Sequence, residues 1–132
     1  MTDILTIILG AGEGTRMKSD QPKVLHKVGG RPMLGHVLAA CAEAGAASRH
    51  VVVGPNHQGL SDYAKSVDSE ITSSIQSERL GTGHAVREAR AAWADFQGHV
   101  LVLFADNPLI SPDVIKDTVQ CLNEGADLAV VG

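Results

Sequence analysis

The sequence predicts an α/β layered fold with a mostly parallel sheet and flanking helices. Short, continuously apolar runs alternate along the chain with segments whose apolar residues recur at helical spacing. The apolar runs lack an alternation with polar residues, which is typical of strands that are buried on both faces. The chain has 132 residues, of which 44% are hydrophobic, and this suffices for one domain with one core.

The first 75 residues contribute three of the expected strands. Residues 4–9 form an isoleucine-rich run that ends in glycines, and residues 51–53 are three valines followed by glycine and proline. A helical pattern over residues 33–41 lies between them and ends at Gly45. A helix over residues 58–66 follows. The polar run over residues 71–75 indicates a third strand, at an edge or at a strand end.

The second half continues the same alternation. The sequence predicts a helix over residues 82–93 and a second strongly buried strand over residues 100–104. Ser111 and Pro112 are typical of a helix start, and the helix that they begin closes at Gly125. A last strand is expected over residues 128–131. Because nothing follows that strand to cover it, we expect a domain that is truncated at its C-terminal end.

Composition excludes several classes of function. A net charge of −4 and only four aromatic residues argue against a nucleic-acid surface, and the charge also argues against an anionic membrane. No apolar run approaches the roughly 18 residues of a membrane span, and the N-terminus does not resemble a signal peptide. Cys41 and Cys121 fall in apolar-periodic segments, so we expect two buried free thiols in a cytoplasmic protein.

The loop after the first strand carries the pattern of a phosphate site. Three glycines in five positions, from Gly10 to Gly14, let the backbone approach a ligand and turn its N–H groups toward an anion. Arg16 adds a forked donor for phosphate oxygens, and Lys23, just after Pro22, adds a point charge. Glycines alone would suit a plain strand-to-helix connection equally well, and the two cations favour phosphate binding.

Two familiar phosphate-binding classes do not fit this loop. No G-x-x-x-x-G-K-[ST] string of a P-loop occurs in the chain. A dinucleotide-binding unit needs G-x-G-x-x-G, whereas the third glycine here comes one residue early. Such a unit also needs an acidic residue after the second strand, where this chain has Gly54 and Pro55. A nicotinamide dehydrogenase is therefore disfavoured.

The same loop resembles the signature of sugar nucleotidyltransferases. The strings GAGEGTRM from Gly10 and PKVLH from Pro22 are most similar to those of bacterial N-acetylglucosamine-1-phosphate uridylyltransferases. The resemblance implies a Rossmann-like nucleotidyltransferase fold, with Arg16 and Lys23 as catalytic residues. It also implies nucleotide binding by a set of loop residues: Leu9, Ala11, Gly12, Gly14 and Lys23. Gly10 departs from the family pattern, which more often has alanine there.

A second motif follows the third expected strand. The Gln76 amide offers both a donor and an acceptor, which can match the N3–H and O4 edge of uracil, and Gly81 allows close backbone approach. Taken alone, this segment suits a surface loop with a helix cap at Thr82. The string from Gln76 to Ala85 also resembles the uridine-binding loop of the same family. The resemblance implies nucleotide binding by Gln76, Gly81 and Thr82.

The third candidate residue is Asp106, directly after the strand expected over residues 100–104. A carboxylate at the carboxyl end of a strand, facing a phosphate loop, suits Mg²⁺, although an aspartate before Pro108 can also stabilise its own turn. The string ADNPLI resembles the family's metal motif, in which glycine stands at the position of Ala105. We expect the added methyl group to lie where the ribose approaches. The six histidines show no metal-ligand spacing, so we interpret them as structural or surface residues.

The resemblance implies a Mg²⁺-dependent reaction of UTP with an amino-sugar 1-phosphate, giving UDP-N-acetylglucosamine and pyrophosphate. It covers only the first part of the family's catalytic domain, so we expect these 132 residues alone to lack turnover. The sugar-binding residues, an acetyltransferase domain and trimer formation are expected in the part that follows in full-length members. Two alternatives remain open: another sugar-1-phosphate nucleotidyltransferase, and a non-catalytic nucleotide-binding module.

Overall fold

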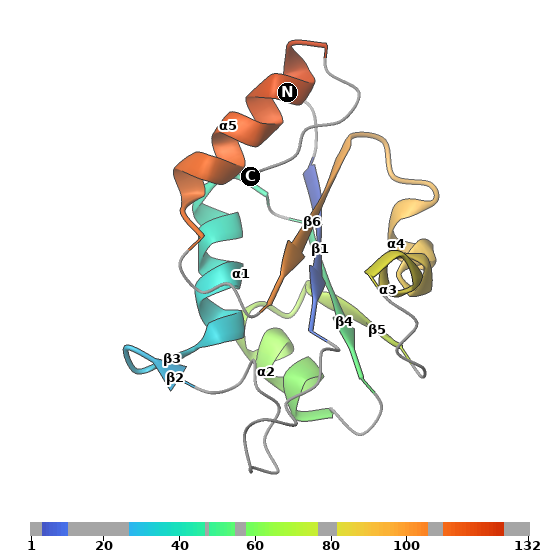
Figure 1. Cartoon of the computed structure of the whole chain (residues 1–132). Coiled ribbons are helices and arrows are strands. Elements are labelled where there is room, and N and C mark those ends of the chain that lie inside the picture. Colours follow the sequence, from blue (N-terminus) through green and yellow to red (C-terminus); the bar gives the residue numbers. More distant parts are fainter. Residues whose placement is uncertain are drawn as a thin grey trace.

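A four-stranded parallel sheet forms the centre of the molecule in a computed structural model, which describes residues 4–10, 27–46, 48–54, 58–76, 82–105 and 110–125. The strands lie in the order β5-β4-β1-β6 (Figure 1). Their bounds are Ile4–Leu9 for β1, Ser48–Val53 for β4, Thr72–Ile75 for β5 and His99–Phe104 for β6. All three pairings are parallel, which confirms the predicted fold class and the prediction that the third strand lies at an edge.

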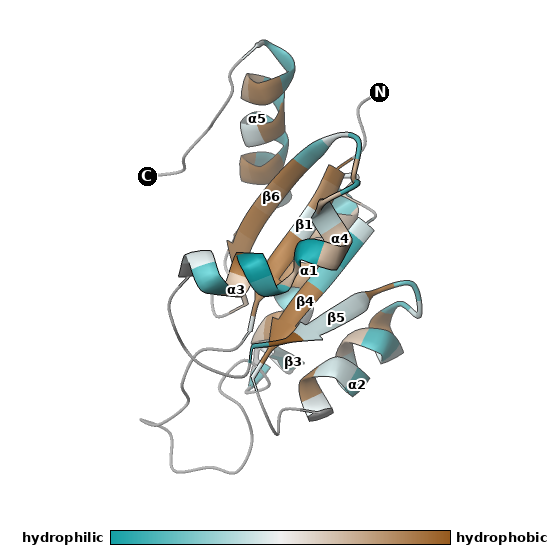
Figure 2. Ribbon diagram, turned by 90° about the vertical axis from the view of Figure 1, so that its right-hand side faces the viewer, coloured by the Kyte–Doolittle hydropathy of each residue, from teal (hydrophilic) through white to brown (hydrophobic). Residues whose placement is uncertain are grey.

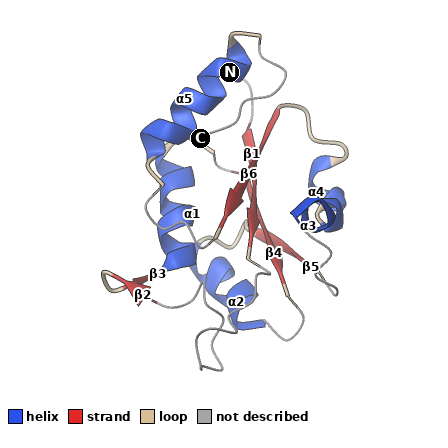
Figure 3. Cartoon of the chain, viewed as in Figure 1, coloured by secondary structure: helices blue, strands red, loops and turns tan. Residues whose placement is uncertain are grey.

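Helices cover both faces of this sheet and make three layers (Figures 1 and 3). One face carries α1 (Met33–Glu43), α2 (Gln58–Val67) and α5 (Pro112–Asn123). The other face carries α3 (Thr82–Glu88) and α4 (Arg90–Trp93). Among the described residues, no helix is long and apolar enough to cross a membrane.

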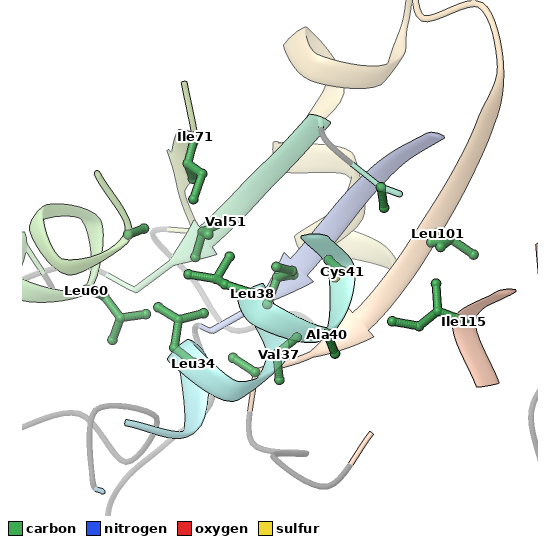
Figure 4. Packing of buried hydrophobic residues seen from close by; sticks show 14 of the residues in the cluster. Leu34, Val37, Leu38, Ala40, Cys41, Val51, Leu60, Ile71, Leu101 and Ile115 are labelled. Atoms are coloured by element: carbon green, nitrogen blue, oxygen red, sulfur yellow. The ribbon is translucent and has the colours of Figure 1, made fainter. Parts of the chain in front are cut away.

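The core divides into two clusters because side chains alternate along a strand. Ile8 of β1 belongs to the larger cluster. Leu34 and Leu38 of α1 belong to the same cluster (Figure 4). Ile7 and Leu9 of β1 point to the opposite face and pack near Ala85 and Ala89. Both faces of β1 are therefore buried, which explains its continuously apolar sequence.

A short hairpin that the sequence analysis did not predict precedes α1. It pairs β2 (Lys27–Val28) with β3 (Arg31–Pro32) in antiparallel fashion. The intervening Gly29 and Gly30 have φ angles of 63° and 82°. Positive φ at both central residues is the conformation of a type I′ turn, one of the two common two-residue hairpin turns, so the glycine pair was the available sequence signal.

The expected helix over residues 82–93 is divided in two, and the prediction of one continuous helix was wrong. The backbone leaves the helical path at Ala89, between α3 and α4. The indole N–H of Trp93 donates to the Val86 carbonyl at 2.8 Å, and the Ala89 amide donates to the same oxygen at 3.1 Å. These donors occupy the carbonyl that the amide of Arg90 would bind in a continuous helix.

The strand β6 is not buried on both faces, contrary to expectation. Leu101 is 8% exposed, whereas Val100, Val102 and Phe104 are 38–51% exposed. The exposed residues are register partners of Leu5, Ile7 and Leu9 and lie on the α3 side of the sheet. On that side α3 packs over β1 and β4, so β6, which is largely hydrophobic in Figure 2, lacks an equivalent cover among the described residues.

The ends of α5 follow the sequence signals. The Ser111 hydroxyl accepts a hydrogen bond from the Val114 amide at 3.2 Å, and Gly125 follows the helix with φ 108°. Cys121 is exposed, whereas Cys41 is buried, so the prediction of two buried thiols holds for Cys41 and is wrong for Cys121. At about 100° per residue, Cys121 lies away from the buried face of Ile115 and Val119. The strand expected over residues 128–131 lies outside the described residues.

Candidate functional site

The strand order reverses direction at β1, and this places the candidate site. From β1 the chain passes to β4 and then to β5 on one side of the sheet, and afterwards returns to β6 on the other side of β1. Loops that leave the carboxyl ends of the strands at such a point diverge to opposite faces of the sheet. In open α/β sheets this is where ligands bind.

Three backbone hydrogen bonds bring the ends of the strands together at this edge. The Gly10 amide donates to the Val52 carbonyl at 2.8 Å, the Ala105 amide donates to the Leu9 carbonyl at 3.0 Å, and the Gln76 amide donates to the Val53 carbonyl at 2.8 Å. The start of the glycine-rich loop, the uridine-motif glutamine and the residue before Asp106 are therefore gathered at one edge. These motifs are far apart in the sequence.

The structure describes part of the predicted site. Leu9 ends β1 and is 9% exposed, Gln76 follows β5 and is 4% exposed, and Thr82 begins α3. The remaining predicted site residues lie outside the described residues: Ala11, Gly12, Gly14, Arg16, Lys23, Gly81 and Asp106. Within the described part of the chain, no group of three His, Cys, Asp or Glu side chains is placed to hold a metal ion.

Gly10 is closely surrounded at the start of the glycine-rich loop. A Cβ atom on this residue would lie 2.8 Å from Leu60 Cδ2 and 3.2 Å from the Val52 carbonyl oxygen. The first distance is far inside van der Waals contact, so α2 packs directly against this part of the backbone, and an added Cβ would displace the end of the Leu60 side chain. The alanine that the resemblance led us to expect at this position would require Leu60 to move.

Ala105, the other departure from the family pattern, does not lie where the sequence analysis expected its methyl group. The residue is 0% exposed and belongs to the core cluster that includes Leu60. A methyl group that is fully covered by protein cannot meet a ribose unless the surrounding core rearranges. The expectation that Ala105 obstructs the ribose is therefore corrected: its methyl group fills the core.

A chain of polar contacts links Gln76 to α3. The amide nitrogen Nε2 of Gln76 lies 3.0 Å from Nδ1 of His84, and Nε2 of His84 lies 3.1 Å from Oε1 of Glu88. His84 and Glu88 are four residues apart, so both project from the same side of α3. The sequence analysis missed these contacts of His84, although the i,i+4 spacing of a histidine and a glutamate was an available signal.

Two ionisable groups with shifted pKa values lie away from this edge and are structural. His50, near the start of β4, bonds Thr72 Oγ1 and Ser74 Oγ at 2.6 Å each, and burial lowers the pKa of its imidazole. Burial raises the pKa of the Cys41 thiol, an effect that Thr6 and Arg49 partly oppose. Arg49 itself pairs with Asp68. Neither group has a place in the candidate site.

Comparison with known proteins gives the family of this fold. The chain matches the model of the MobA-like NTP transferase domain over residues 6–132. It is 47% identical over 128 residues to the Bifunctional protein GlmU of Rhodopseudomonas palustris (strain BisB5). The alignment covers 97% of this chain and 28% of that relative, so the chain spans less than a third of the length of the protein that it matches.

Solved structures agree with the fold. A UDP-glucose pyrophosphorylase complexed with UDP-glucose has a TM-score of 0.77 and 23% identity, covering 94% of this chain and 54% of its own. Rv0371C from Mycobacterium tuberculosis, in complex with manganese, has a TM-score of 0.66 and 17% identity, covering 93% and 61%. At such identities these structures support the fold alone. The family match extends over nearly the whole chain, and the chain therefore belongs to the MobA-like NTP transferase domain family.

Proposed function

We propose that this chain is the nucleotide-binding part of an N-acetylglucosamine-1-phosphate uridylyltransferase. The reaction transfers a uridylyl group from UTP to the sugar 1-phosphate and gives UDP-N-acetylglucosamine and pyrophosphate. The observation that carries the proposal is the meeting of three motifs at the carboxyl edge of the sheet, through the backbone bonds of Gly10, Gln76 and Ala105. The 47% identity to a bifunctional GlmU protein supports the same assignment.

The chemistry requires positioning and charge neutralisation more than a reactive side chain. A phosphate oxygen of the sugar 1-phosphate attacks the α-phosphorus of UTP, the bond from that phosphorus to the bridging oxygen breaks, and pyrophosphate leaves. The nucleophile is already an anion, so neither a side-chain nucleophile nor a strong base is needed. Arg16 and Lys23 hold the phosphates and offset the charge that develops on them.

The nucleotide itself is held by backbone and amide groups in this proposal. Leu9, Ala11, Gly12 and Gly14 approach the triphosphate and ribose, and Gln76 reads the uracil edge with Gly81 and Thr82 beside it. Because Gln76 is 4% exposed, only a ligand that reaches into this position can contact its amide.

Asp106 is the residue that would hold Mg²⁺. It directly follows Ala105, whose amide is bonded to Leu9 at the carboxyl edge, and its carboxylate is a donor that Mg²⁺ prefers. When bound, Mg²⁺ would neutralise phosphate charge at this position. An Asp106→Asn variant should weaken Mg²⁺-dependent UTP binding while leaving metal-free binding nearly unchanged, as calorimetry with and without EDTA can measure.

The remaining parts of the reaction are assigned to regions that the match does not cover. The chain corresponds to 28% of the GlmU relative, so in this proposal the amino-sugar site and the trimer contacts lie in the rest of such a protein. The proposed site of the reaction is the cytoplasm, where UTP is available.

Nucleotide binding is the direct test of this chain. We expect calorimetry to give UTP binding that Arg16→Ala weakens, with Arg90→Ala on the exposed side of α4 as the matched control. Gln76→Ala should reduce the preference for UTP over CTP, whereas Gln97→Ala, at an exposed position, should not. Equal affinities for UTP and CTP in the unmodified chain would contradict the uridylyl assignment.

The complete gene product provides the second test. Pyrophosphate release is measured with UTP, Mg²⁺ and N-acetylglucosamine 1-phosphate, and a panel of other nucleotides and sugar phosphates serves for comparison. Faster turnover with a different pair would reassign the enzyme to another sugar-1-phosphate nucleotidyltransferase. Absence of turnover with every pair, together with retained nucleotide binding, would leave a binding module.

A further inference from the structure

The segment between β1 and β2 carries the two cations that the proposed function assigns to the phosphates, and the structure describes both of its ends. Gly10 follows β1, and Lys27 begins the hairpin of β2 and β3 that leads into α1. Arg16 and Lys23 lie between these two points in the sequence. The relative placement of the two ends therefore limits where the cations can be presented to a ligand.

One side chain of α2 lies against the first end. A Cβ atom on Gly10 would be 2.8 Å from Leu60 Cδ2, so the end of the leucine side chain lies directly against the glycine backbone. Leu60 is 0% exposed and belongs to the larger core cluster, which holds its side chain in place. The Gly10 amide also donates to the Val52 carbonyl at 2.8 Å. The start of the segment is therefore held by α2 and β4 together.

A second side chain of α2 reaches the other end through α1. Gly35, in the first turn of α1, is buried, and a Cβ atom on it would overlap the Tyr63 hydroxyl oxygen and lie 2.9 Å from Arg31 Cγ. Tyr63 and Arg31 therefore pack against the same point of the α1 backbone. Arg31 belongs to β3, whose pairing with β2 places Lys27 opposite Pro32. Tyr63 thus helps to fix the hairpin that ends the segment.

These two side chains belong to one face of α2. Leu60 and Tyr63 are three residues apart, and this spacing places side chains next to each other on a helix. The helices α1 and α2 and the hairpin lie together near the end of the sheet where β1 finishes (Figure 1). One face of α2 therefore supports both ends of the segment, directly at Gly10 and through Gly35 at the hairpin.

We infer that Leu60 and Tyr63 are positioning residues for the triphosphate of the bound nucleotide. Each acts through the backbone against which it packs, and not by touching the nucleotide. Hydrogen bonds to phosphate oxygens weaken steeply when their donors are misplaced, whereas the proposed function places the contacts to the base elsewhere, after β5. Loosening α2 should therefore weaken binding of the triphosphate more than binding of the nucleoside. This role rests on the proposed assignment of Arg16 and Lys23 to the phosphates.

The binding test compares UTP with uridine by NMR titration, which measures weak and tight binding alike. The ratio of the uridine and UTP dissociation constants expresses what the phosphates add to the affinity. We expect Leu60→Val to lower this ratio on the order of fivefold, and Tyr63→Phe, which removes only the hydroxyl that lies against Gly35, to lower it about threefold. Leu38→Val is the same change at another fully buried position of the same cluster, and it should leave the ratio unchanged.

The outcomes separate this role from the proposed function. If the unmodified chain binds UTP more tightly than uridine, a variant that keeps the same ratio overturns the positioning role of its residue while the proposed function stands. Equal weakening of both ligands, or an equal fall of the ratio in Leu38→Val, has the same meaning, because a general loosening of the core would produce either result. Equal affinities for UTP and uridine in the unmodified chain would instead contradict the phosphate role of Arg16 and Lys23.

Amide hydrogen exchange tests the packing without nucleotide. The Gly10 amide is bonded to the Val52 carbonyl, so its exchange reports how firmly the start of the segment is held. The backbone amide of Gln76, bonded to the Val53 carbonyl, serves as an internal reference for the stability of the sheet. Relative to this reference, Gly10 should exchange faster in Leu60→Val and at an unchanged rate in Leu38→Val. An unchanged relative rate in Leu60→Val would overturn the role of Leu60.

Discussion

Replacing Gly10 with alanine tests how α2 constrains the start of the glycine-rich loop. The new Cβ would lie 2.8 Å from Leu60 Cδ2 and 3.2 Å from the Val52 carbonyl oxygen. Such overpacking costs about 1–3 kcal/mol, whereas replacing a glycine with alanine recovers about 0.4–1 kcal/mol from the unfolded chain. We therefore expect Gly10→Ala to lower the free energy of unfolding by about 0.5–2 kcal/mol, measured by urea denaturation.

A double-mutant cycle tests whether contact with Leu60 causes the expected destabilisation by Gly10→Ala. Leu60 is 0% exposed, so Leu60→Val alone should cost about 1 kcal/mol. The double variant should lose about 1 kcal/mol less unfolding free energy than the sum of the two single variants, because the shorter side chain removes the clashing methyl group. Gly83→Ala, with nothing within 4 Å of the added carbon, is the control and should not destabilise the chain. Additivity within about 0.5 kcal/mol would refute the steric explanation.

Three further predictions concern the framework around the site. Burial lowers the pKa of His50 below its ordinary 6.5, so on acidification the imidazole is protonated in the unfolded chain before it is protonated in the folded chain. The contribution of His50 to the free energy of unfolding should therefore be constant above about pH 6.5 and fall below that pH, by at most about 1.4 kcal/mol per pH unit. His50→Gln should remove that part of the pH dependence of urea unfolding, whereas His99→Gln should keep it. Ser111→Ala should lower the unfolding free energy by about 1 kcal/mol through loss of the α5 cap; an unchanged urea midpoint would contradict this. A thiol reagent should modify Cys121 in the native chain and Cys41 only after unfolding, and rapid native reaction of both would contradict the burial of Cys41.

Apolar patterning was sufficient to predict the central layers of the fold. The strands β1 and β4 are buried on both faces, and their runs of isoleucine and valine carry that information directly. The same reasoning failed for β6. A continuously apolar sequence does not reveal whether a helix covers both faces of the strand or only one. Exposure of Phe104 depends on where α3 packs, which is a tertiary property.

The sequence predicted where the motifs of the candidate site lie in the fold, but it did not predict which side chains they contact. Strand ends in a parallel sheet meet at one edge, so the loop after Leu9, the glutamine after β5 and the residue after β6 were expected together. The close contact of Gly10 with Leu60 and the bond of Gln76 to His84 depend on how α2 and α3 dock against the sheet. A single sequence does not specify such docking.

Gly10 and Ala105, the two residues that depart from the pattern implied by the resemblance, do not constrain each other sterically in the structure. They directly follow the adjacent strands β1 and β6, but a Cβ on Gly10 would lie 3.8 Å from Ala105 Cβ, an ordinary van der Waals distance. Ala105 therefore does not hinder alanine at position 10, whereas the Leu60 side chain would have to move. We expect Ala105→Gly to cost about 1 kcal/mol by removing a buried methyl group, and to leave the penalty of Gly10→Ala unchanged in a second cycle. Because that methyl group is covered, Ala105→Gly should not tighten UTP binding either. A gain of severalfold in UTP affinity would show that the methyl group does meet the ribose, and that the core around Leu60 rearranges when nucleotide binds.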